Sequence, residues 1–304
     1  MKALSKPRFS VVIPAYYSFS TIRSTLSALS EQACESYEVI VVNSSPEEKT
    51  EEIVREFPGT RFIQSPVRLL PHGARNAGIA RARGDFIVFT DPDCIADREW
   101  LSLLDAAFEK GHRVLVGAMG LAGDSWLEVG IHLSKFHWLL PGLKPGVRTC
   151  APTANAAYSR DLLEETGLFP GEVFAGDGIL SRRAASLGHP PVFVPEAVVH
   201  HTHDEGIASF FRTRFSRGKE YAWVRMKIMG PATPGTFISL ALSPAAVILV
   251  ILRAGKNASA AGWIGRFFYT LPIQIAGHLA WALGESIGAA EIMLGRKRFR
   301  GSRC

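Results

Sequence analysis

The stretch Asp85-Phe86-Ile87-Val88-Phe89-Thr90-Asp91-Pro92-Asp93 joins a buried strand to two carboxylates. A short apolar run that begins after Gly84 and ends before a proline is typical of a strand covered on both faces. Asp91 and Asp93 follow at once, so both project from the turn after the strand. Hard oxygen ligands of this kind suit Mg²⁺ or Mn²⁺, which complete their coordination with water and phosphate oxygens. The sequence therefore predicts a metal site at the end of a strand.

Strand and helix patterns alternate around this stretch. We expect strands at 9–13, 37–42, 61–64, 85–90 and 113–118, and helices at 20–32, 46–57 and 98–110. Such alternation predicts a mixed, mainly parallel sheet with helices on both faces, and its ligands bind beyond the carboxyl ends of the strands. Three loops fall at such ends: Pro14–Tyr17, Asn43–Ser45 and Asp91–Asp93. They are expected to converge on one crevice.

The second half of the chain has less regular patterns. Residues 120–148 predict a long loop or a broken helix. Further helices are expected at 160–166 and 178–187, a strand at 191–199, and a basic amphipathic helix at 207–229. In that last helix the basic residues are expected to face a membrane, and binding of a lipid-linked phosphate is the alternative; they are Arg212, Arg214, Arg217 and Lys219.

The last 70 residues are much more apolar than the rest. Residues 236–252 and 263–294 form two apolar stretches, and a basic cluster follows at 296–303. A spanning helix needs about 20 apolar residues. We therefore expect a helical hairpin, joined at 253–262, that spans a bilayer or lies in its interface, with both ends on the cytoplasmic side. A buried hairpin within a soluble domain is the alternative.

Charge and cysteine content limit the choice of partners. The net charge of +6 favours anionic partners such as nucleotide phosphates or a membrane surface. The sequence has no nucleic-acid-binding signature, so nucleic acid is not expected as a partner. The four cysteines have neither metal-like spacing nor the density of a disulfide framework, which fits a reducing cytosol. The N-terminus runs into a strand without a signal-peptide pattern.

Taken in order, several blocks resemble those of the family 2 glycosyltransferases, which have the Rossmann-like GT-A fold. The resemblance covers roughly residues 8–225. The blocks are Phe9–Tyr16, Glu38–Ser45, Arg75-Asn76-x-Gly78, Asp91-x-Asp93, Asn155–Tyr158 and Gly176-Asp177. It implies a catalytic domain at 1–230. The apolar stretches and the basic cluster that follow predict a membrane-associated helical hairpin and basic tail at 231–304.

The resemblance also implies a donor site. It assigns the nucleoside to Pro14, Ala15, Tyr16 and Asn43, although the family usually has Asp where Asn43 stands. Arg75 would neutralise the diphosphate through paired donors. Asp93 would coordinate Mg²⁺ or Mn²⁺, while Asp91 would support the metal or bind the ribose.

A general base is implied further along the chain. Asp177 matches the later Asp of the family, and as a base it would take the proton from the acceptor hydroxyl. Here it follows Gly176, where the family more often has Glu. An Asp at the start of a helix also suits a cap.

Additional contacts to the diphosphate or acceptor are expected from His201 or His203 and from Arg214. Neighbouring residues of a strand point to opposite faces, so the three histidines of the His200-His201-x-His203 sequence cannot share one ion. A polar strand-end turn is the alternative for these histidines.

Together these features predict an inverting, metal-dependent glycosyltransferase attached to a membrane, with its catalytic domain on the cytoplasmic side. It would use a nucleotide-diphosphate sugar and a lipid-linked or glycan acceptor. A non-catalytic binding or scaffold protein is the first alternative, because of Asn43 and Gly176. A nucleotidyltransferase is the second, but no glycine-rich phosphate loop follows the first strand.

Overall fold

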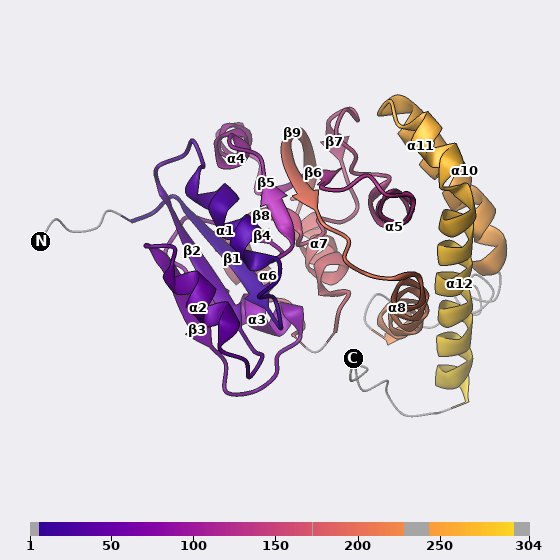
Figure 1. Cartoon of the computed structure of the whole chain (residues 1–304), viewed down its shortest axis with the longest axis horizontal. Coiled ribbons are helices and arrows are strands. Elements are labelled where there is room, and N and C mark those ends of the chain that lie inside the picture. The colour runs from indigo at the N-terminus through magenta and orange to yellow at the C-terminus, as the bar shows by residue number, and fades with distance from the viewer. Residues whose placement is uncertain (1–5, 172, 228–242, 295–304) are drawn as a thin grey trace, which may run out of the picture. The chain divides into compact units, whose positions relative to one another are not determined.

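The computed structural model describes residues 6–171, 173–227 and 243–294 (Figure 1). The chain divides into two compact units. The first comprises residues 1–120, 144–172 and 176–201, and the second comprises 121–143, 173–175 and 202–304. We describe each unit by itself.

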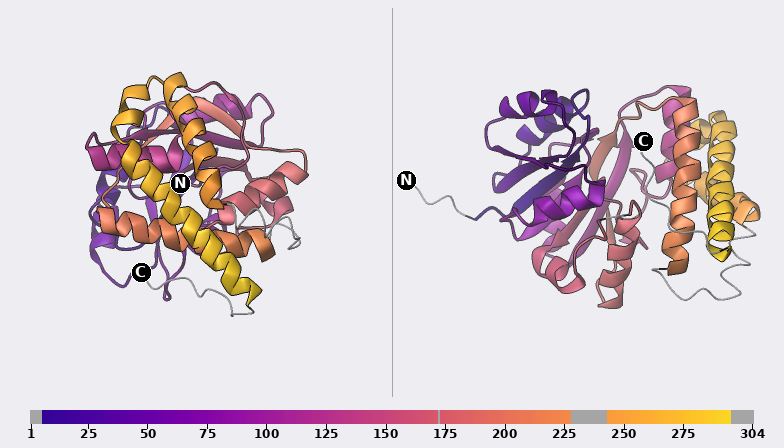
Figure 2. Two further views of the ribbon diagram at one scale, coloured as in Figure 1. Left: turned by 90° about the vertical axis from the view of Figure 1, so that its right-hand side faces the viewer. Right: turned by 90° about the horizontal axis from the view of Figure 1, so that it is seen from below.

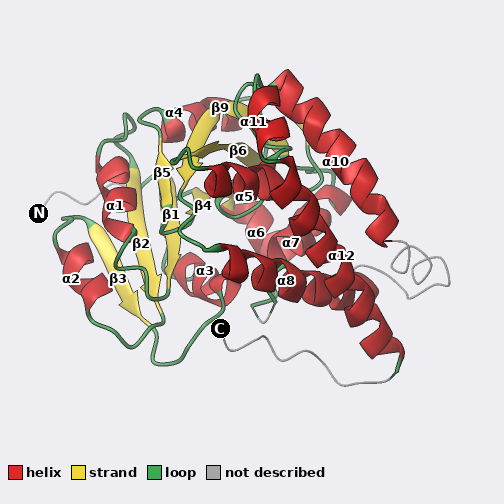
Figure 3. Cartoon of the chain, turned by 45° about the vertical axis from the view of Figure 1, so that its right-hand side comes forward, coloured by secondary structure: helices red, strands yellow, loops and turns green. Residues whose placement is uncertain are grey.

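A parallel half-sheet forms the core of the first unit (Figure 3). Its strands are β1 (Phe9–Ala15), β2 (Tyr37–Asn43), β3 (Thr60–Gln64) and β4 (Phe86–Thr90), in the order β3-β2-β1-β4. All three pairings are parallel. Residues of β1 from Phe9 to Ala15 are buried, as a strand covered on both faces requires.

Helices cover both faces of these strands, as predicted. The helices are α1 (Ile22–Ser30), α2 (Lys49–Arg55), α3 (Pro71–Ile79) and α4 (Trp100–Phe108). The connections through α1 and α2 run in one direction across the sheet and the connection through α3 runs back, so right-handed crossovers place α3 on the opposite face. Helix α3 lies very close to the sheet, because a Cβ at Gly78 would sit 2.3 Å from Val12 Cγ1.

The other half of the sheet is antiparallel, so the prediction of a mainly parallel sheet holds only for the first half. Beyond β4 the order continues β8 (Asn155–Ser159), β6 (Val114–Leu121), β9 (Val192–His201) and β5 (Cys94–Ala96), and β7 (Gly146–Val147) pairs with β9. Asn155 fixes this half. It accepts from Trp100 Nε1 at 2.9 Å and donates to the carbonyls of Ala118 (2.8 Å) and Ala197 (2.9 Å).

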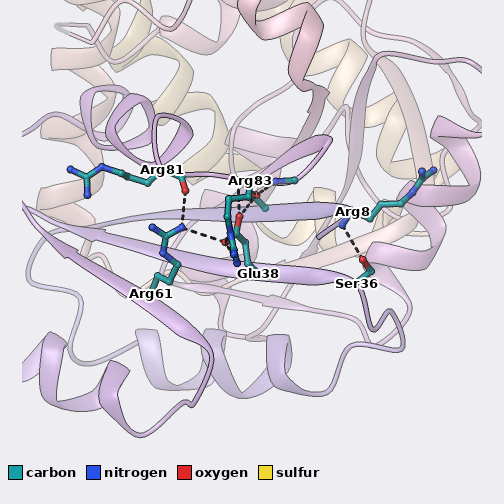
Figure 4. Close-up of polar contacts among 8 residues, drawn as sticks. Arg8, Ser36, Glu38, Arg61, Arg81 and Arg83 are labelled. Atoms are coloured by element: carbon teal, nitrogen blue, oxygen red, sulfur yellow. Dashed lines mark hydrogen bonds and ion pairs between the residues drawn. The ribbon is translucent and has the colours of Figure 1, made fainter. Parts of the chain in front are cut away.

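The amino ends of the strands are held by a buried carboxylate (Figure 4). Glu38 is 6 % exposed and accepts from Ser10 Oγ at 2.8 Å and from Arg83 Nε at 3.0 Å. Burial opposes its ionisation, but the hydrogen bonds from Ser10 and Arg83 outweigh it and lower the pKa of Glu38. Arg61 Nη1 completes the cluster at 3.4 Å. The loops predicted to form the crevice begin at the opposite, carboxyl ends of β1, β2 and β4.

The second unit consists of helices in two layers. They are α5 (Trp126–Phe136), α8 (Ile207–Lys227), α10 (Ser243–Ala260), α11 (Ile264–Tyr269) and α12 (Leu271–Met293), while α6 (Arg160–Thr166) and α7 (Gly176–Ser186) belong to the first unit. In both views of Figure 2, α10, α11 and α12 form a layer over α5 and α8. Helix α5 occupies the stretch predicted as a loop or broken helix. Ser125 and Glu128 form a capping box at its start, which the prediction overlooked.

Helices α8 and α12 pack with their backbones in contact. A Cβ at Gly218 would lie 2.1 Å from the Trp281 carbonyl, and one at Gly284 would lie 2.1 Å from the Phe215 carbonyl. Ion pairs join the same helices, Arg225 to Glu285 at 2.9 Å and Lys219 to Glu291 at 2.8 Å. Lys219, one of the basic residues predicted to face a membrane, therefore pairs with an acid on α12 instead. For Arg212, which is exposed, that orientation stays a prediction.

The apolar tail also differs from the predicted hairpin. Helix α10 continues into the expected break at 253–262 and ends at Ala260. Beyond its end, Trp263 N donates to the Ala258 carbonyl and Gly262 takes a φ of 77°. Residues 236–242 of the first predicted helix lie outside the described residues. Among the described helices, none is both long and apolar enough to cross a bilayer. A membrane-spanning hairpin is therefore unsupported.

The predicted boundary at residue 230 also differs from the two compact units. Helices α5 and α8 group with α10–α12 and not with the sheet, because α12 packs along α8 and also contacts α5. The assignment of a catalytic domain to 1–230 stays a prediction.

Candidate active site

The ends of β1 and β2 carry an exposed aromatic side chain. Ala15 and Asn43 are register partners, so the loops after both strands start side by side. Tyr16 is 37 % exposed, and the Arg68 guanidinium lies over its ring at 4.5 Å from the centroid. Pro14 and Ala15 are buried. Of the predicted nucleoside contacts, Tyr16 is thus the one whose side chain is available to stack on a base. Arg68 was missed, because no pattern links it to Tyr16 in sequence.

Asn43 is fully buried and its amide is already engaged. Its Nδ2 donates to the Ser45 carbonyl at 3.2 Å and to Gln64 Oε1 at 2.9 Å, and its Oδ1 accepts from Ser45 Oγ at 2.7 Å. Both amide hydrogens are used, so Asn43 shapes the loop after β2. Its predicted contact with the nucleoside stays a prediction, which this burial disfavours.

Arg75 and Asp91 form an ion pair at the end of β4. Arg75 is 3 % exposed and donates from Nη2 to Asp91 Oδ1, while Nη1 lies 3.4 Å from His72 Nδ1. His72 in turn stacks on Phe169, with ring centroids 4.8 Å apart. Arg75 was expected to bind a diphosphate directly, but its guanidinium is instead buried against Asp91. It is therefore better placed to orient Asp91 than to meet a ligand itself.

Asp93 meets His201 because of strand pairing. Strands β5 and β9 are antiparallel with Cys94 opposite His201, so Asp93, just before β5, comes beside the end of β9. His201 Nε2 lies 3.7 Å from Asp93 Oδ2, and the Asp93 side chain is 35 % exposed. His200 points the other way and lies 3.0 Å from Asp97 Oδ1. The predicted alternation of these histidines is thus confirmed for this pair.

The donor atoms at this point fit a divalent cation. Ligand atoms of Asp93, Cys94 and His201 all lie within 4.8 Å of one another. A carboxylate oxygen suits Mn²⁺ or Mg²⁺, and an imidazole nitrogen suits transition-metal ions, whereas a thiolate selects softer ions. Burial raises the pKa of the Cys94 thiol well above its ordinary value, and the nearby Asp93 and Asp91 charges raise it further. Asp93 and His201 are accordingly the pair that would hold the ion.

Asp177 lies in the first turn of α7, and its position depends on Gly176. Asp177 Oδ1 accepts from the Gly178 backbone N–H at 2.8 Å. A Cβ at Gly176 would lie 2.6 Å from His72 Cδ2, so the backbone at this point rests on the imidazole that contacts Arg75. The residue before Asp177 must therefore be small here. That contact gives a physical reason for the missing acid, and it links α7 to the Arg75–Asp91 pair through His72.

Two of the predicted residues lie in the second unit. His203 Nε2 is 3.2 Å from His132 Nδ1, in a buried pair. Arg214 donates from Nε to the Gly277 carbonyl at 3.3 Å, and its guanidinium lies over the Trp281 ring at 4.7 Å. Both side chains thus have contacts within their own unit. Their predicted roles toward a diphosphate or acceptor stay predictions.

A hollow of about 490 Å³ lies in the first unit, away from these residues. It is lined at the amino end of β4 by Asp85, Phe86, Arg113 and Arg160 among others. Asp91 and Asp93 lie past the opposite end of the same strand. Ligands of sheets that contain parallel crossovers bind at the carboxyl ends, so this hollow is not the candidate site.

Comparison with known proteins identifies the class. The sequence profile described as "Glycosyl transferase family 2" matches residues 10–167, which is more than half of the chain. The chain belongs to this family. The matched segment contains Tyr16, Arg75, Asp91 and Asp93, whereas Asp177 and His201 lie beyond it.

Several relatives of this chain are named as glycosyltransferases. The chain is 25 % identical over 238 residues to the glycosyltransferase AglE of Haloferax volcanii, which takes in 73 % of this chain and 76 % of the relative. It is 24 % identical to the O-antigen chain rhamnosyltransferase WbaN of Salmonella anatum, over 75 % of this chain and 78 % of that protein.

Solved structures show the same fold. The mannosyltransferase PcManGT of Pyrobaculum calidifontis, solved with GDP-Man and Mn²⁺, superposes with a TM-score of 0.63 at 20 % identity, covering 93 % of this chain and 87 % of that one. TarS of S. aureus, solved as residues 1–349 with UDP-GlcNAc, gives a TM-score of 0.53 at 19 % identity, with coverage of 95 % and 92 %. The predicted GT-A-like architecture is confirmed.

Proposed function

We propose that this chain transfers a sugar, with inversion, from a nucleotide-diphosphate donor to a hydroxyl of a lipid-linked or polysaccharide acceptor. The observation that carries the proposal is the approach of His201 Nε2 to Asp93 Oδ2, 3.7 Å apart at the carboxyl end of the sheet. Family membership supplies the reaction class. The donors and acceptors named for the relatives give the substrate classes to test.

Each residue of the site has a proposed role. Tyr16 and Arg68 would stack on the base. The buried Arg75 would hold Asp91 toward the ribose or the metal. Asp93 and His201 would hold Mg²⁺ or Mn²⁺. A divalent cation bound there would supply Lewis-acid stabilisation of the charge that develops on the leaving diphosphate.

The transfer would be a single displacement. Asp177 would accept the proton of the acceptor hydroxyl, and the hydroxyl oxygen would form its bond to the anomeric carbon from the face opposite the diphosphate. The bond from the anomeric carbon to the diphosphate breaks, and the diphosphate keeps the electron pair. One carboxylate and one displacement imply inversion at that carbon.

The proposed location is the cytoplasmic face of a membrane.

A donor panel tests this proposal. The purified full chain would be incubated with GDP-mannose, UDP-N-acetylglucosamine and a nucleotide-activated rhamnose, with Mn²⁺ or with excess EDTA, and release of nucleoside diphosphate measured. We expect release from at least one donor with Mn²⁺ and its loss with EDTA. Undiminished release in EDTA would remove the metal from the mechanism. Donor binding without any release would favour a non-catalytic binding protein.

A further inference from the structure

Helix α12 has an inverted distribution of polar and apolar side chains. Its large exposed side chains include Ile275, Leu279, Leu283 and Ile287, which are 37–52 % exposed and recur every four residues along one face. The polar residues of the same helix are turned inward. Gln274 is fully buried, and His278 and Glu285 are 8 % and 6 % exposed. A helix that faces water has the opposite arrangement.

Neighbouring helices extend the apolar surface. The side chains of Ile248, Leu249 and Leu252 on α10 are 56–66 % exposed, and those of Phe268 and Tyr269 at the end of α11 are 64 % and 67 % exposed. These helices belong to the same layer as α12 (Figure 2). We call the exposed apolar residues of α10, α11 and α12 the apolar layer. An extended apolar surface of this kind marks a protein or membrane contact.

The charges around the apolar layer select between these occupants. Between residues 246 and 294 every exposed charged residue is basic: Arg253, Lys256 and Arg266. The two acids of this segment are Glu285, which is buried, and Glu291, which pairs with Lys219 at 2.8 Å. A symmetric contact with a second copy would bring like charges together. An anionic lipid surface complements them, and exposed aromatic side chains suit its interface.

We infer that the apolar layer is the membrane-binding surface of this protein, and that it lies in the interface of an anionic bilayer. The attachment is by the sides of α10, α11 and α12, because the exposed apolar side chains lie along these sides. Arg253, Lys256 and Arg266 would contact lipid phosphates. The inference deepens the membrane attachment within the proposed function, but its test measures lipid binding and not sugar transfer, so either can fail alone.

Vesicle flotation tests the inference with the full chain. Protein transferred from mild detergent would be mixed with vesicles of phosphatidylcholine alone or with phosphatidylglycerol added. The variant Leu279→Ser/Leu283→Ser/Ile287→Ser removes half-exposed side chains that are not needed for the core. This variant should reduce vesicle partition by about 100-fold. Each of the three replaced side chains would lose roughly half of the burial free energy of an aliphatic side chain. Arg253→Gln/Lys256→Gln/Arg266→Gln should remove the preference for the anionic vesicles.

A matched control lies in the first unit. Val67, Val147 and Leu187 are 62 %, 63 % and 43 % exposed, and their replacement by Ser should leave flotation unchanged. Circular dichroism would confirm that all variants are folded. Equal flotation of the α12 variant and the wild type would overturn the inference. A second result would also overturn the inference. If the wild type is a dimer without lipid, the α12 variant is a monomer, and vesicles bind neither protein, the apolar layer is an interface between copies.

Discussion

Acidification should destabilise the second unit, the helical one, through the half-buried His137 and the buried His278. Burial lowers the pKa of His137 to about 4, with Arg214 and Arg253 contributing, and burial lowers that of His278 to about 3, with Arg214 and His137 contributing. Both stay neutral in the folded chain, while the unfolded chain protonates them below pH 6.5. The unfolded state then binds more protons, so stability is full above pH 6.5 and falls as pH is lowered.

The size of this loss follows from the pKa difference. One pH unit below 6.5, at pH 5.5, each histidine costs about 1.4 kcal/mol, or about 3 kcal/mol together. Burial raises the pKa of Glu220 and of Glu285, which acts in the opposite direction. The variant His278→Gln separates the effects, because it removes one titrating group. Between pH 7.5 and 5.5 the free energy of unfolding of this variant should fall by about 1.4 kcal/mol less than that of the wild type.

Urea unfolding monitored by tryptophan fluorescence measures this difference. The signal reports mainly on the second unit, because five of the six tryptophans lie there: Trp126, Trp138, Trp223, Trp263 and Trp281. The control is Ile273→Val, a buried site on α12, which should lower stability by about 1 kcal/mol at every pH. The reasoning is refuted if His278→Gln and wild type lose the same stability between pH 7.5 and 5.5.

Three further predictions concern the first unit. Asp93→Asn should abolish nearly all nucleoside-diphosphate release while far-ultraviolet circular dichroism stays unchanged, and His200→Gln, whose ring contacts Asp97 on the other side of the strand, should keep its activity. Asp177→Asn should lower the transfer rate by about 10²–10⁴-fold while donor affinity is retained. The control is Asp161→Asn, because Asp161 also accepts from the next backbone N–H. A parallel loss of donor affinity in Asp177→Asn would make Asp177 structural. Asn155→Ala should lower the free energy of unfolding by about 3 kcal/mol, because it removes the hydrogen bonds that Asn155 makes with Trp100 Nε1 and with the carbonyls of Ala118 and Ala197. An unchanged urea midpoint would contradict that role.

Local patterns predicted much of the parallel half of the sheet. The apolar runs at 9–13 and 37–42 correspond to β1 and β2, and the carboxylates at 91 and 93 follow β4 as expected. These features depend on neighbours in sequence, namely strand length, burial on both faces and a terminating proline. Asp93 was therefore visible from the sequence as a strand-end carboxylate.

Contacts between distant segments were not predictable in the same way. The pairing of β5 with β9 brings Asp93 to His201, and β5 has only three residues, too few for a periodic pattern. The roles of His72 and Gly176 depend on a contact across about 100 residues of chain. The signal that could have suggested it is the replacement of an acid by glycine before Asp177.

The tail shows why hydropathy alone was insufficient. Its apolar content predicted a separable membrane hairpin, but His278 and Glu285 of α12 contact Arg214 and Arg225 of α8. Sequence cannot tell which face of a helix is buried when another helix supplies polar partners. Ending the chain at Gly230 would uncover the face of α8 that α12 covers, so the shortened chain should aggregate.

The most direct test of the account is cation-dependent binding of nucleoside diphosphates. Thermal shifts of the full chain would be measured with GDP, UDP and dTDP, each with and without Mn²⁺, for the wild type, Asp93→Asn and His201→Gln. One nucleotide should stabilise the wild type only with Mn²⁺, by about 2.7 kcal/mol at 100 times its dissociation constant, and should stabilise neither variant. Equal stabilisation of all three proteins with Mn²⁺ would contradict a metal site at Asp93 and His201.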